Sequence, residues 1–295
     1  MSILKRWRNA ILMCIASCLL IASNSHAQKL TDTGFSDPNW TKDYEPFRIV
    51  GNLYYVGTYD LACYLVTTPQ GHILINTGVG SSAPMIRKHV EKLGFKFSDI
   101  KILLATHAHF DHVGAMAAVK KLTGAQMMIN AEDADVLADG GNSDYVMGGK
   151  GPSFLPVKAD RLLHDHDTVK LGGMNIVVLD HPGHTAGANS FLLDVKDEKR
   201  TYRVLIANMP SVLDETNLAG MPLYPTVAKD YAYTYKAMRA LQFDLWVASH
   251  ASQFDLQKKH PAGSAYNPEA FNDRAGYDKL LGELEKKYLR KLKEK

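Results

Sequence analysis

The chain has 295 residues, of which 46% are hydrophobic and 22% are charged, a composition typical of a globular protein with a sizeable core. The formal net charge is only +3, with 34 Lys and Arg against 31 Asp and Glu. The densest basic run, residues 286–295, alternates with Glu and Leu as a solvated helix face does, so we expect no nucleic-acid partner.

Residues 1–27 have the pattern of a secretory signal peptide. Basic residues are followed by an apolar run at 10–22 and by small residues, which predicts cleavage before Gln28. The run is too short to span a bilayer comfortably. The expected mature protein, residues 28–295, is a single periplasmic domain without stable membrane association. An alternative is a lipoprotein anchored at Cys18, although the apolar run continues past that cysteine.

The predicted elements begin with three strands and continue as a mixture of helices and strands. In chain order they are strands at 52–56, 63–67 and 72–76, a helix at 82–93, a strand at 101–106, a helix at 115–122, strands at 175–179, 190–194 and 202–206, a helix at 231–241, a strand at 243–248 and an amphipathic helix along 277–292. Mixed sheets covered by helices are the natural way to bury such a set.

One segment and one cysteine stand apart from this pattern. Residues 140–156 are rich in Gly and long for a connection, which is typical of either a functional lid or a mobile loop. Both interpretations remain open, with Tyr145 and Phe154 as candidate apolar contacts of a lid. Cys63 is the only cysteine of the expected mature chain, so no internal disulfide can form, and its apolar neighbours predict a buried core thiol.

The densest cluster of chemically useful side chains directly follows the strand predicted at 101–106. His107, His109, Asp111 and His112 lie within six residues. Imidazole and carboxylate suit zinc, and catalytic zinc typically takes three protein ligands and a water. A short turn can aim the first two side chains to one side and the last two to another, so this one segment could serve two metals.

Further histidines follow two other predicted strands. His181 and His184 lie in a Gly-containing turn after residues 175–179, and His250 follows the strand at 243–248. Side chains at the ends of neighbouring strands commonly form a site on a sheet. The other histidines lack such a position and are expected to be structural or exposed: His72, His89, His164, His166 and His260.

The H-x-H-x-D-H motif with later histidines resembles the metallo-β-lactamase superfamily, and most of all the GOB branch of its subclass B3. The similarity extends over nearly all of the expected mature chain, including residues 44–49, 51–60, 73–78, 204–211 and 246–254. The resemblance implies an α+β fold, an αββα sandwich of two mixed β-sheets flanked by helices, with the site at one edge.

The resemblance also implies a set of ligands and an activity. It assigns one zinc to His107, His109 and His184, and a second zinc to Asp111, His112 and His250. A metal-bound hydroxide would open the β-lactam ring of penicillins, cephalosporins or carbapenems, with all six residues taking part and Asp111 orienting the hydroxide. The expected partner is this small substrate, and the expected protein is a monomer.

Three positions depart from relatives. His107 stands where the GOB branch has Gln, which predicts a complete first site and two zinc ions. Asn76 stands where many members have Asp, which alters the hydrogen bonding near the metals. Met209 stands near a position where other subclasses have a Cys ligand, and is expected to pack under the site. Alternatives are another exported metallohydrolase, such as an acyl-homoserine lactonase, and a zinc-binding protein without catalysis.

Overall fold

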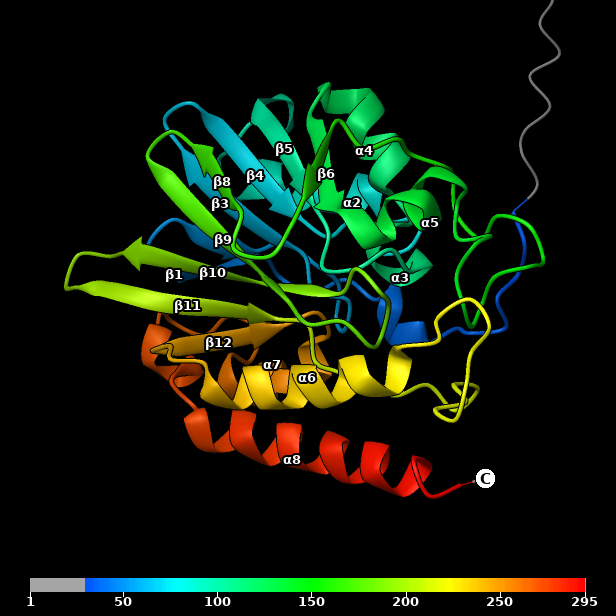
Figure 1. The fold of residues 1–295 in the computed structure, drawn as a ribbon. Helices are drawn as coiled ribbons and strands as arrows, with labels where there is room; N and C mark the ends of the chain where they lie inside the picture. Colours follow the sequence, from blue (N-terminus) through cyan, green and yellow to red (C-terminus); the bar gives the residue numbers. More distant parts are fainter. Residues whose placement is uncertain (1–29, 295) are drawn as a thin grey trace, which may run out of the picture.

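The computed structural model describes residues 30–294, so the predicted signal peptide and the alternative anchor at Cys18 lie outside the described residues. The described chain forms four layers, with two β-sheets face to face and helices on both outer sides (Figure 1). This is the expected αββα sandwich. Within residues 30–294, no helix is both long and apolar enough to cross a membrane.

The first sheet has seven strands in the described chain, paired in sequence order. They are β1 (Phe47–Val50), β2 (Leu53–Tyr55), β3 (Tyr64–Thr68), β4 (Gly71–Ile75), β5 (Ile100–Leu104), β6 (Gln126–Asn130) and β7 (Arg161–Leu163). Pairing is antiparallel from β1 to β4 and parallel from β4 to β7. The parallel half matters for the site, because its strands end at the same edge of the sheet.

The second sheet has five described strands in the order β12-β11-β10-β9-β8. Their bounds are β8 (Thr168–Leu171), β9 (Met174–Asp180), β10 (Asn189–Lys196), β11 (Thr201–Ala207) and β12 (Leu245–Ala248). Only β11 and β12 pair in parallel, joined through the crossover helix α6 (Val227–Ala240). The β11–β12 pair therefore also ends at one edge.

The remaining helices cover the outer faces of the two sheets or form short turns. The α-helices are α2 (Ala83–Lys92), α3 (Phe110–Val113), α4 (Met116–Thr123), α5 (Ala134–Ala138), α7 (Leu256–Lys259) and α8 (Arg274–Lys291). Single 3₁₀ turns are η1 (Pro38–Trp40), η2 (Phe97–Asp99), η3 (Ala131–Asp133), η4 (Ala251–Phe254) and η5 (Pro268–Phe271). In Figure 1, α2, α4 and α5 lie over the first sheet, and α6 and α8 lie under the second.

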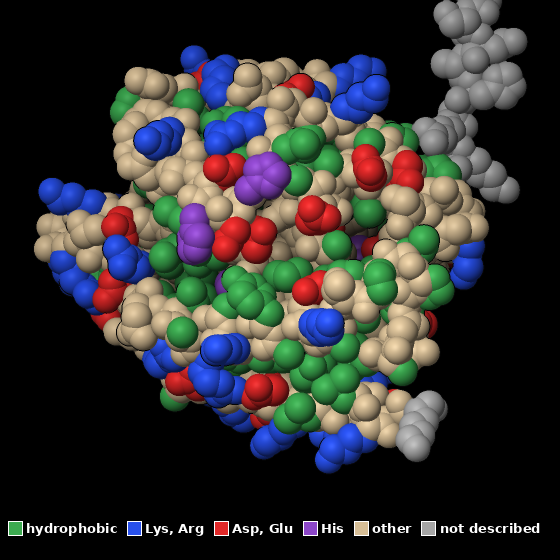
Figure 2. Space-filling view, in the orientation of Figure 1, with side chains coloured by type: hydrophobic (Ala, Val, Ile, Leu, Met, Phe, Trp, Pro, Cys, Tyr) green, Lys and Arg blue, Asp and Glu red, His purple; other side chains and the backbone are tan. Residues whose placement is uncertain are grey.

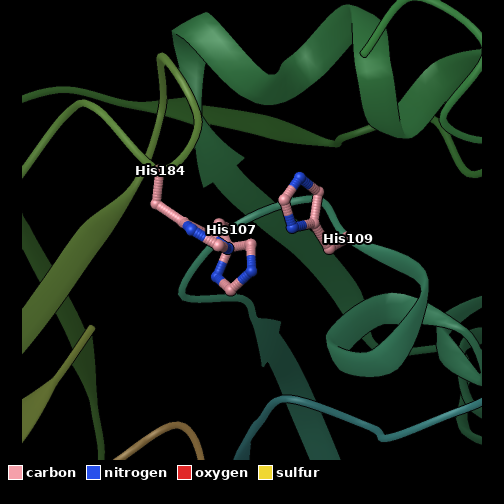
Figure 3. Close-up of side chains that lie close together, drawn as sticks. All are labelled: His107, His109 and His184. Atoms are coloured by element: carbon pink, nitrogen blue, oxygen red, sulfur yellow. The ribbon is translucent and has the colours of Figure 1, made fainter. Parts of the chain in front are cut away.

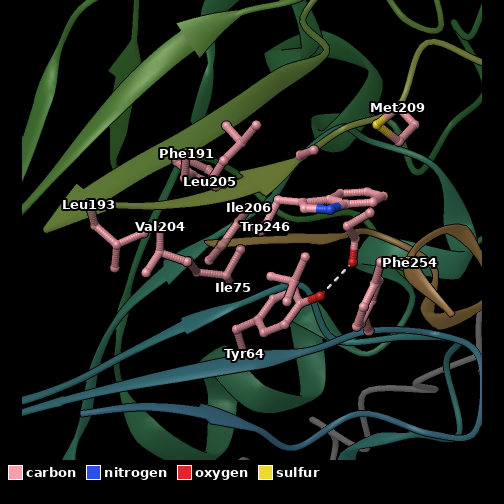
Figure 4. Close-up of a cluster of buried hydrophobic side chains, with 14 of the residues drawn as sticks. Tyr64, Ile75, Phe191, Leu193, Val204, Leu205, Ile206, Met209, Trp246 and Phe254 are labelled. Atoms are coloured by element: carbon pink, nitrogen blue, oxygen red, sulfur yellow. Dashed lines mark hydrogen bonds between the residues drawn. The ribbon is translucent and has the colours of Figure 1, made fainter. Parts of the chain in front are cut away.

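The alternation of side chains along β3 divides the core into two layers. Tyr64 and Val66 join the cluster between the sheets, whereas Cys63 and Leu65 join the cluster beneath the outer helices. Cys63 is buried and free, as expected. The Tyr64 hydroxyl donates a hydrogen bond of 2.5 Å to the Ala248 carbonyl, which ties β3 to the end of β12 (Figure 4).

The strands and helices predicted from periodicity are all present, with ends shifted by a few residues. Four strands were not predicted: β1, β6, β7 and β8. Three of them are only three or four residues long, and β6 contains two methionines and no aromatic residue. Such short or weakly patterned strands form because neighbouring strands pair with them, which a local pattern cannot reveal.

Candidate metal centre

The six predicted ligands come from three segments that end at one edge of the sandwich. These segments are the β5–α3 connection, the β9–β10 loop and the end of β12. They carry, in that order, His107, His109, Asp111 and His112; His184; and His250. The structure therefore brings together all six side chains, although up to 143 positions separate them in the sequence.

Three imidazoles form the first donor group. His107, His109 and His184 are buried, and the centroids of each pair of rings lie 4.7 Å apart. One donor nitrogen from each ring lies within 4.8 Å of the others, and the rings converge from two separate loops (Figure 3). Such spacing allows one ion to contact all three rings.

Hydrogen bonds occupy one nitrogen of each of these rings, for His107 a 3.4 Å contact of Nδ1 with the Thr106 hydroxyl, and leave the other nitrogen free. His184 Nδ1 lies 2.8 Å from the Ser211 carbonyl, and His109 Nε2 lies 3.1 Å from an Asp144 carboxylate oxygen. His107 Nε2 is buried without any hydrogen-bond partner. A buried imidazole nitrogen without a partner is costly, so this donor set fits a zinc ion.

The second donor group is centred on Asp111. One of its carboxylate oxygens lies 3.3 Å from His112 Nε2 and 3.4 Å from His250 Nε2. Donor atoms of Asp111, His112 and His107 lie within 4.8 Å of one another. His250 is not a member of this compact group, but its Nε2 contacts Asp111 and its ring centroid lies 4.9 Å from that of His112. His107 borders both groups, so the two candidate sites adjoin.

The electrostatics of the site favour cation binding. Burial, together with neighbouring histidines, lowers the pKa of His184 to about 3 and holds the pKa of His107 well below its usual value. Both rings are therefore neutral at pH 7, which is the form that binds metals. His250 differs, because its hydrogen bonds to Asp111 and Asp60 outweigh burial and raise its pKa to about 9. Metal binding at His250 would release a proton.

Two carboxylates that belong to no ligand motif support this arrangement. Asp60 accepts a hydrogen bond from His250 Nδ1 at 3.0 Å and another from Trp40 Nε1 at 3.2 Å. Asp133 accepts three, from the Ala108 amide, the Thr185 hydroxyl and the Gly187 amide, each at 2.8 Å. Asp133 thus connects the β5–α3 segment to the β9–β10 loop. Nothing local in the sequence marks either residue.

Two unusual positions from the sequence lie beside the candidate donor groups. Asn76 directly follows β4 and has a φ of 62°, which Asn tolerates better than most residues. Its side chain accepts from the Thr106 amide at 3.0 Å and lies 3.5 Å from His112 Nδ1, a weak contact. Met209 is buried and belongs to the hydrophobic core cluster (Figure 4), and it also lines the pocket that contains His107 and His184, as expected.

The remaining histidines lie outside both donor groups of the described chain. His181 is buried and contacts the Ser190 hydroxyl at 2.7 Å, so it supports the β9–β10 loop. His89 is buried and lies 2.7 Å from Asp43. The His166 side chain is 76% exposed. The placements of His89 and His166 agree with the structural and surface roles expected for them, whereas His181, which lies in a turn that the sequence marked as a candidate site, has a structural role.

The two donor groups lie at the floor of an open cleft of about 620 Å³. Its walls are largely apolar and come from the N-terminal segment, α3 and two loops: Phe35, Trp40, Phe110, Met147 and Leu213. The expectation that Tyr145 and Phe154 would contribute such apolar contacts is wrong for this cleft. Phe154 is 2% exposed and packs in the core beneath the outer helices, and Tyr145 points its hydroxyl at the backbone of the β9–β10 loop.

Charge on the molecular surface is mixed. Figure 2 shows Lys and Arg interspersed with Asp and Glu over the visible face. Charged side chains of the described chain also form ion pairs near the surface, such as Arg203 with Asp194 and Arg239 with Glu285. The face shown carries no concentrated basic patch.

Comparison with known proteins agrees with this geometry. Residues 57–197 match the model of a family described as the metallo-β-lactamase superfamily. Among curated proteins, a hydroxyacylglutathione hydrolase of Rhodopseudomonas palustris is 30% identical over 135 residues, which is 44% of this chain. The match spans only 42% of that relative's length, so it shows the shared fold region and not the relative's activity.

Solved structures match over far more of the chain. A β-lactamase from Chitinophaga pinensis is 67% identical, with a TM-score of 0.87, over 88% of this chain and 98% of that one. LRA-12, a class B3 di-zinc metallo-β-lactamase from an Alaskan soil metagenome, is 56% identical, with a TM-score of 0.87. The match covers 90% of this chain and 99% of LRA-12. The metallo-β-lactamase GOB-18 from Elizabethkingia meningoseptica is 52% identical, with a TM-score of 0.89. The match covers 91% of this chain and 100% of GOB-18. The chain therefore belongs to the metallo-β-lactamase superfamily, in its subclass B3.

Proposed function

We propose that this protein is a zinc-dependent β-lactamase that hydrolyses the ring amide of β-lactam antibiotics with two bound zinc ions, and so confers resistance to them. The observation that carries the proposal is the convergence of six metal donors at the floor of an open, apolar-walled cleft. The high identity to a β-lactamase and to a di-zinc class B3 enzyme over almost their entire length supports it.

The donor geometry suggests how two ions would be shared. His107, His109 and His184 would hold the first zinc, each through the ring nitrogen that its hydrogen bonds leave free. Asp111, His112 and His250 would hold the second. When bound, zinc polarises a carbonyl and supplies a deprotonated water as nucleophile near neutral pH.

The chain's own residues would orient and enclose the substrate. The apolar walls formed by Phe35, Trp40 and Phe110 exclude water and pack against the carbon skeleton of the antibiotic. Asp111 directs its carboxylate between His112 and His250, where it can accept a proton or a hydrogen bond from the attacking water. Because the nucleophile would be a zinc-bound hydroxide, no covalent acyl-enzyme is proposed.

We further propose that the protein acts in the periplasm as a monomer. The signal-peptide pattern of residues 1–27 supports export, and cleavage before Gln28 would release the domain. An exported enzyme meets the antibiotic before its cell-wall targets. Intact-mass analysis of protein from the native host tests the location, because a lipid-modified Cys18 would contradict release.

The direct test follows hydrolysis of a carbapenem and a chromogenic cephalosporin by purified residues 28–295. Turnover should disappear with EDTA and return with zinc. His107→Ala should lose most turnover, because it removes the ligand that borders both sites. His166→Ala is the matched control, because that side chain is 76% exposed, and it should retain full activity.

Other outcomes would redirect the assignment. Protein that holds two zincs but opens no β-lactam would contradict the proposed substrate, and turnover of an acyl-homoserine lactone would then favour a lactonase. Zinc uptake with no turnover of lactams, lactones or thioesters would indicate a zinc-binding protein without catalysis.

A further inference from the structure

Residues 140–156, connecting α5 to β7, form a compact loop closed by its own backbone. The Ser153 amide donates to the Gly140 carbonyl at 2.8 Å, and the Gly149 amide donates to the Asn142 carbonyl at 2.8 Å. Gly140 has a φ of 75°, and a Cβ there would lie 2.4 Å from the Phe154 carbonyl oxygen. The loop therefore has a defined conformation, which depends on glycine at this turn.

The Asp144 carboxylate of this loop is held in place from both sides. The residue is 4% exposed. One carboxylate oxygen accepts from the amides of Val146 and Met147, at 2.9 and 2.6 Å, and the other lies 3.1 Å from His109 Nε2. Its orientation is thus set by the loop backbone and does not depend on a metal. With its oxygens engaged in this way, Asp144 is a partner of His109 rather than a further ligand.

The next residue reaches the other loop of the first donor group. The Tyr145 hydroxyl lies 2.9 Å from the Gly183 carbonyl and 3.3 Å from the His184 carbonyl. Its ring packs edge-on against Tyr224, with centroids 5.0 Å apart. Adjacent residues of one loop therefore contact two of the three imidazoles, or their backbone, in the first donor group.

We propose that Asp144 and Tyr145 are positioning residues that hold His109 and His184 in the geometry and tautomer required by the first zinc. A carboxylate that accepts the Nε2 proton of His109 leaves the Nδ1 lone pair free for metal, and it increases the basicity of the ring. The hydroxyl of Tyr145 fixes the backbone that carries His184. The inference rests on the proposed function only in requiring zinc at the first site, and it requires no particular substrate.

Asp144→Asn is the sharpest perturbation. If the amide oxygen keeps the bonds from Val146 and Met147, the NH₂ group faces His109 Nε2. The ring then carries its proton on Nδ1, the nitrogen that should bind zinc. We expect a roughly 10- to 100-fold loss of zinc affinity at the first site, measured by stepwise titration of the metal-free protein against a chromophoric chelator. Asp135→Asn, on the exposed face of α5, is the matched control and should not change the affinity.

Tyr145→Phe removes a single hydroxyl and should weaken the first site by about 2- to 10-fold. In both variants the second site should keep its affinity, and the absorption of bound Co²⁺ should change only for the first equivalent. A merely structural role would weaken both sites alike or lower the stability of the metal-free protein without changing the Co²⁺ spectrum.

The proposal is overturned if Asp144→Asn binds the first zinc as tightly as the wild type, or if both sites weaken equally. Because zinc affinity is measured without substrate, the result is independent of β-lactam turnover. A wild-type protein that binds two zincs but hydrolyses no β-lactam would contradict the proposed function and leave this inference intact.

Discussion

Asp133 provides a quantitative test of how the metal centre is assembled. It is 1% exposed and accepts hydrogen bonds from the Ala108 amide, the Thr185 hydroxyl and the Gly187 amide. Asp133→Asn keeps the shape of the side chain but replaces one acceptor oxygen with an NH₂ donor. The hydroxyl can rotate to accept, whereas a backbone N–H cannot, so one of the two amides loses its acceptor.

The expected cost follows from burial. Leaving one buried N–H without a partner costs about 1–3 kcal/mol, and a hydrogen bond to a charged acceptor contributes about 1.5–3 kcal/mol. These terms overlap, so we expect Asp133→Asn to lower the free energy of unfolding by about 2–4 kcal/mol. That is a large share of the roughly 5–15 kcal/mol that holds a typical domain folded.

Urea unfolding of the metal-free protein, followed by tryptophan fluorescence and circular dichroism, measures this difference. Thr185→Val removes one hydroxyl and should cost about 1 kcal/mol. The exposed variant Asp135→Asn should remain within about 0.5 kcal/mol of the wild type. If Asp133→Asn were as stable as this control, the three hydrogen bonds could not be what joins the two ligand loops.

Three further outcomes are expected. Asp60→Asn should weaken zinc binding at the second site by about 10- to 100-fold in chelator competition, because it weakens the hydrogen bond that orients His250. Asp135→Asn is again the control, and an unchanged zinc affinity of Asp60→Asn would contradict this role. Tyr64→Phe should lower the free energy of unfolding by about 1–2 kcal/mol in urea, because the Ala248 carbonyl loses its donor, while the number of bound zincs stays at the wild-type value. Removing zinc with EDTA should lower the free energy of unfolding by about 4 kcal/mol if the free zinc concentration had been about 1,000 times its dissociation constant. A melting curve that EDTA does not change would rule out tight zinc binding to the folded state alone.

The sequence alone was sufficient to identify the candidate ligands and the class of fold. His107, His109, Asp111 and His112 lie within six consecutive positions, and this density of donors after a strand has few structural explanations. The longer strands were equally evident, because alternation along β3 and β4 places one set of side chains between the sheets and the other beneath the helices.

Other features depended on contacts between residues distant in the sequence. In the turn after β9, the sequence offers both His181 and His184, and only the fold shows that His181 contacts Ser190 while His184 faces the first donor group. Phe154 was a candidate apolar contact of a lid and lies in the core instead. The sequence of a loop gives its residue types, but the packing of the loop sets the direction of each side chain.

The supporting carboxylates show most clearly what a local sequence pattern cannot predict. Asp60, Asp133 and Asp144 look like ordinary polar residues in their local sequences, yet each contacts a ligand or its loop across 25 to 190 positions. A carboxylate becomes a support only when folding removes water from around it and places a donor within 3.1 Å. The sequence by itself therefore determined which side chains are candidate zinc ligands, and the tertiary structure decided which ring nitrogens remain free of other partners.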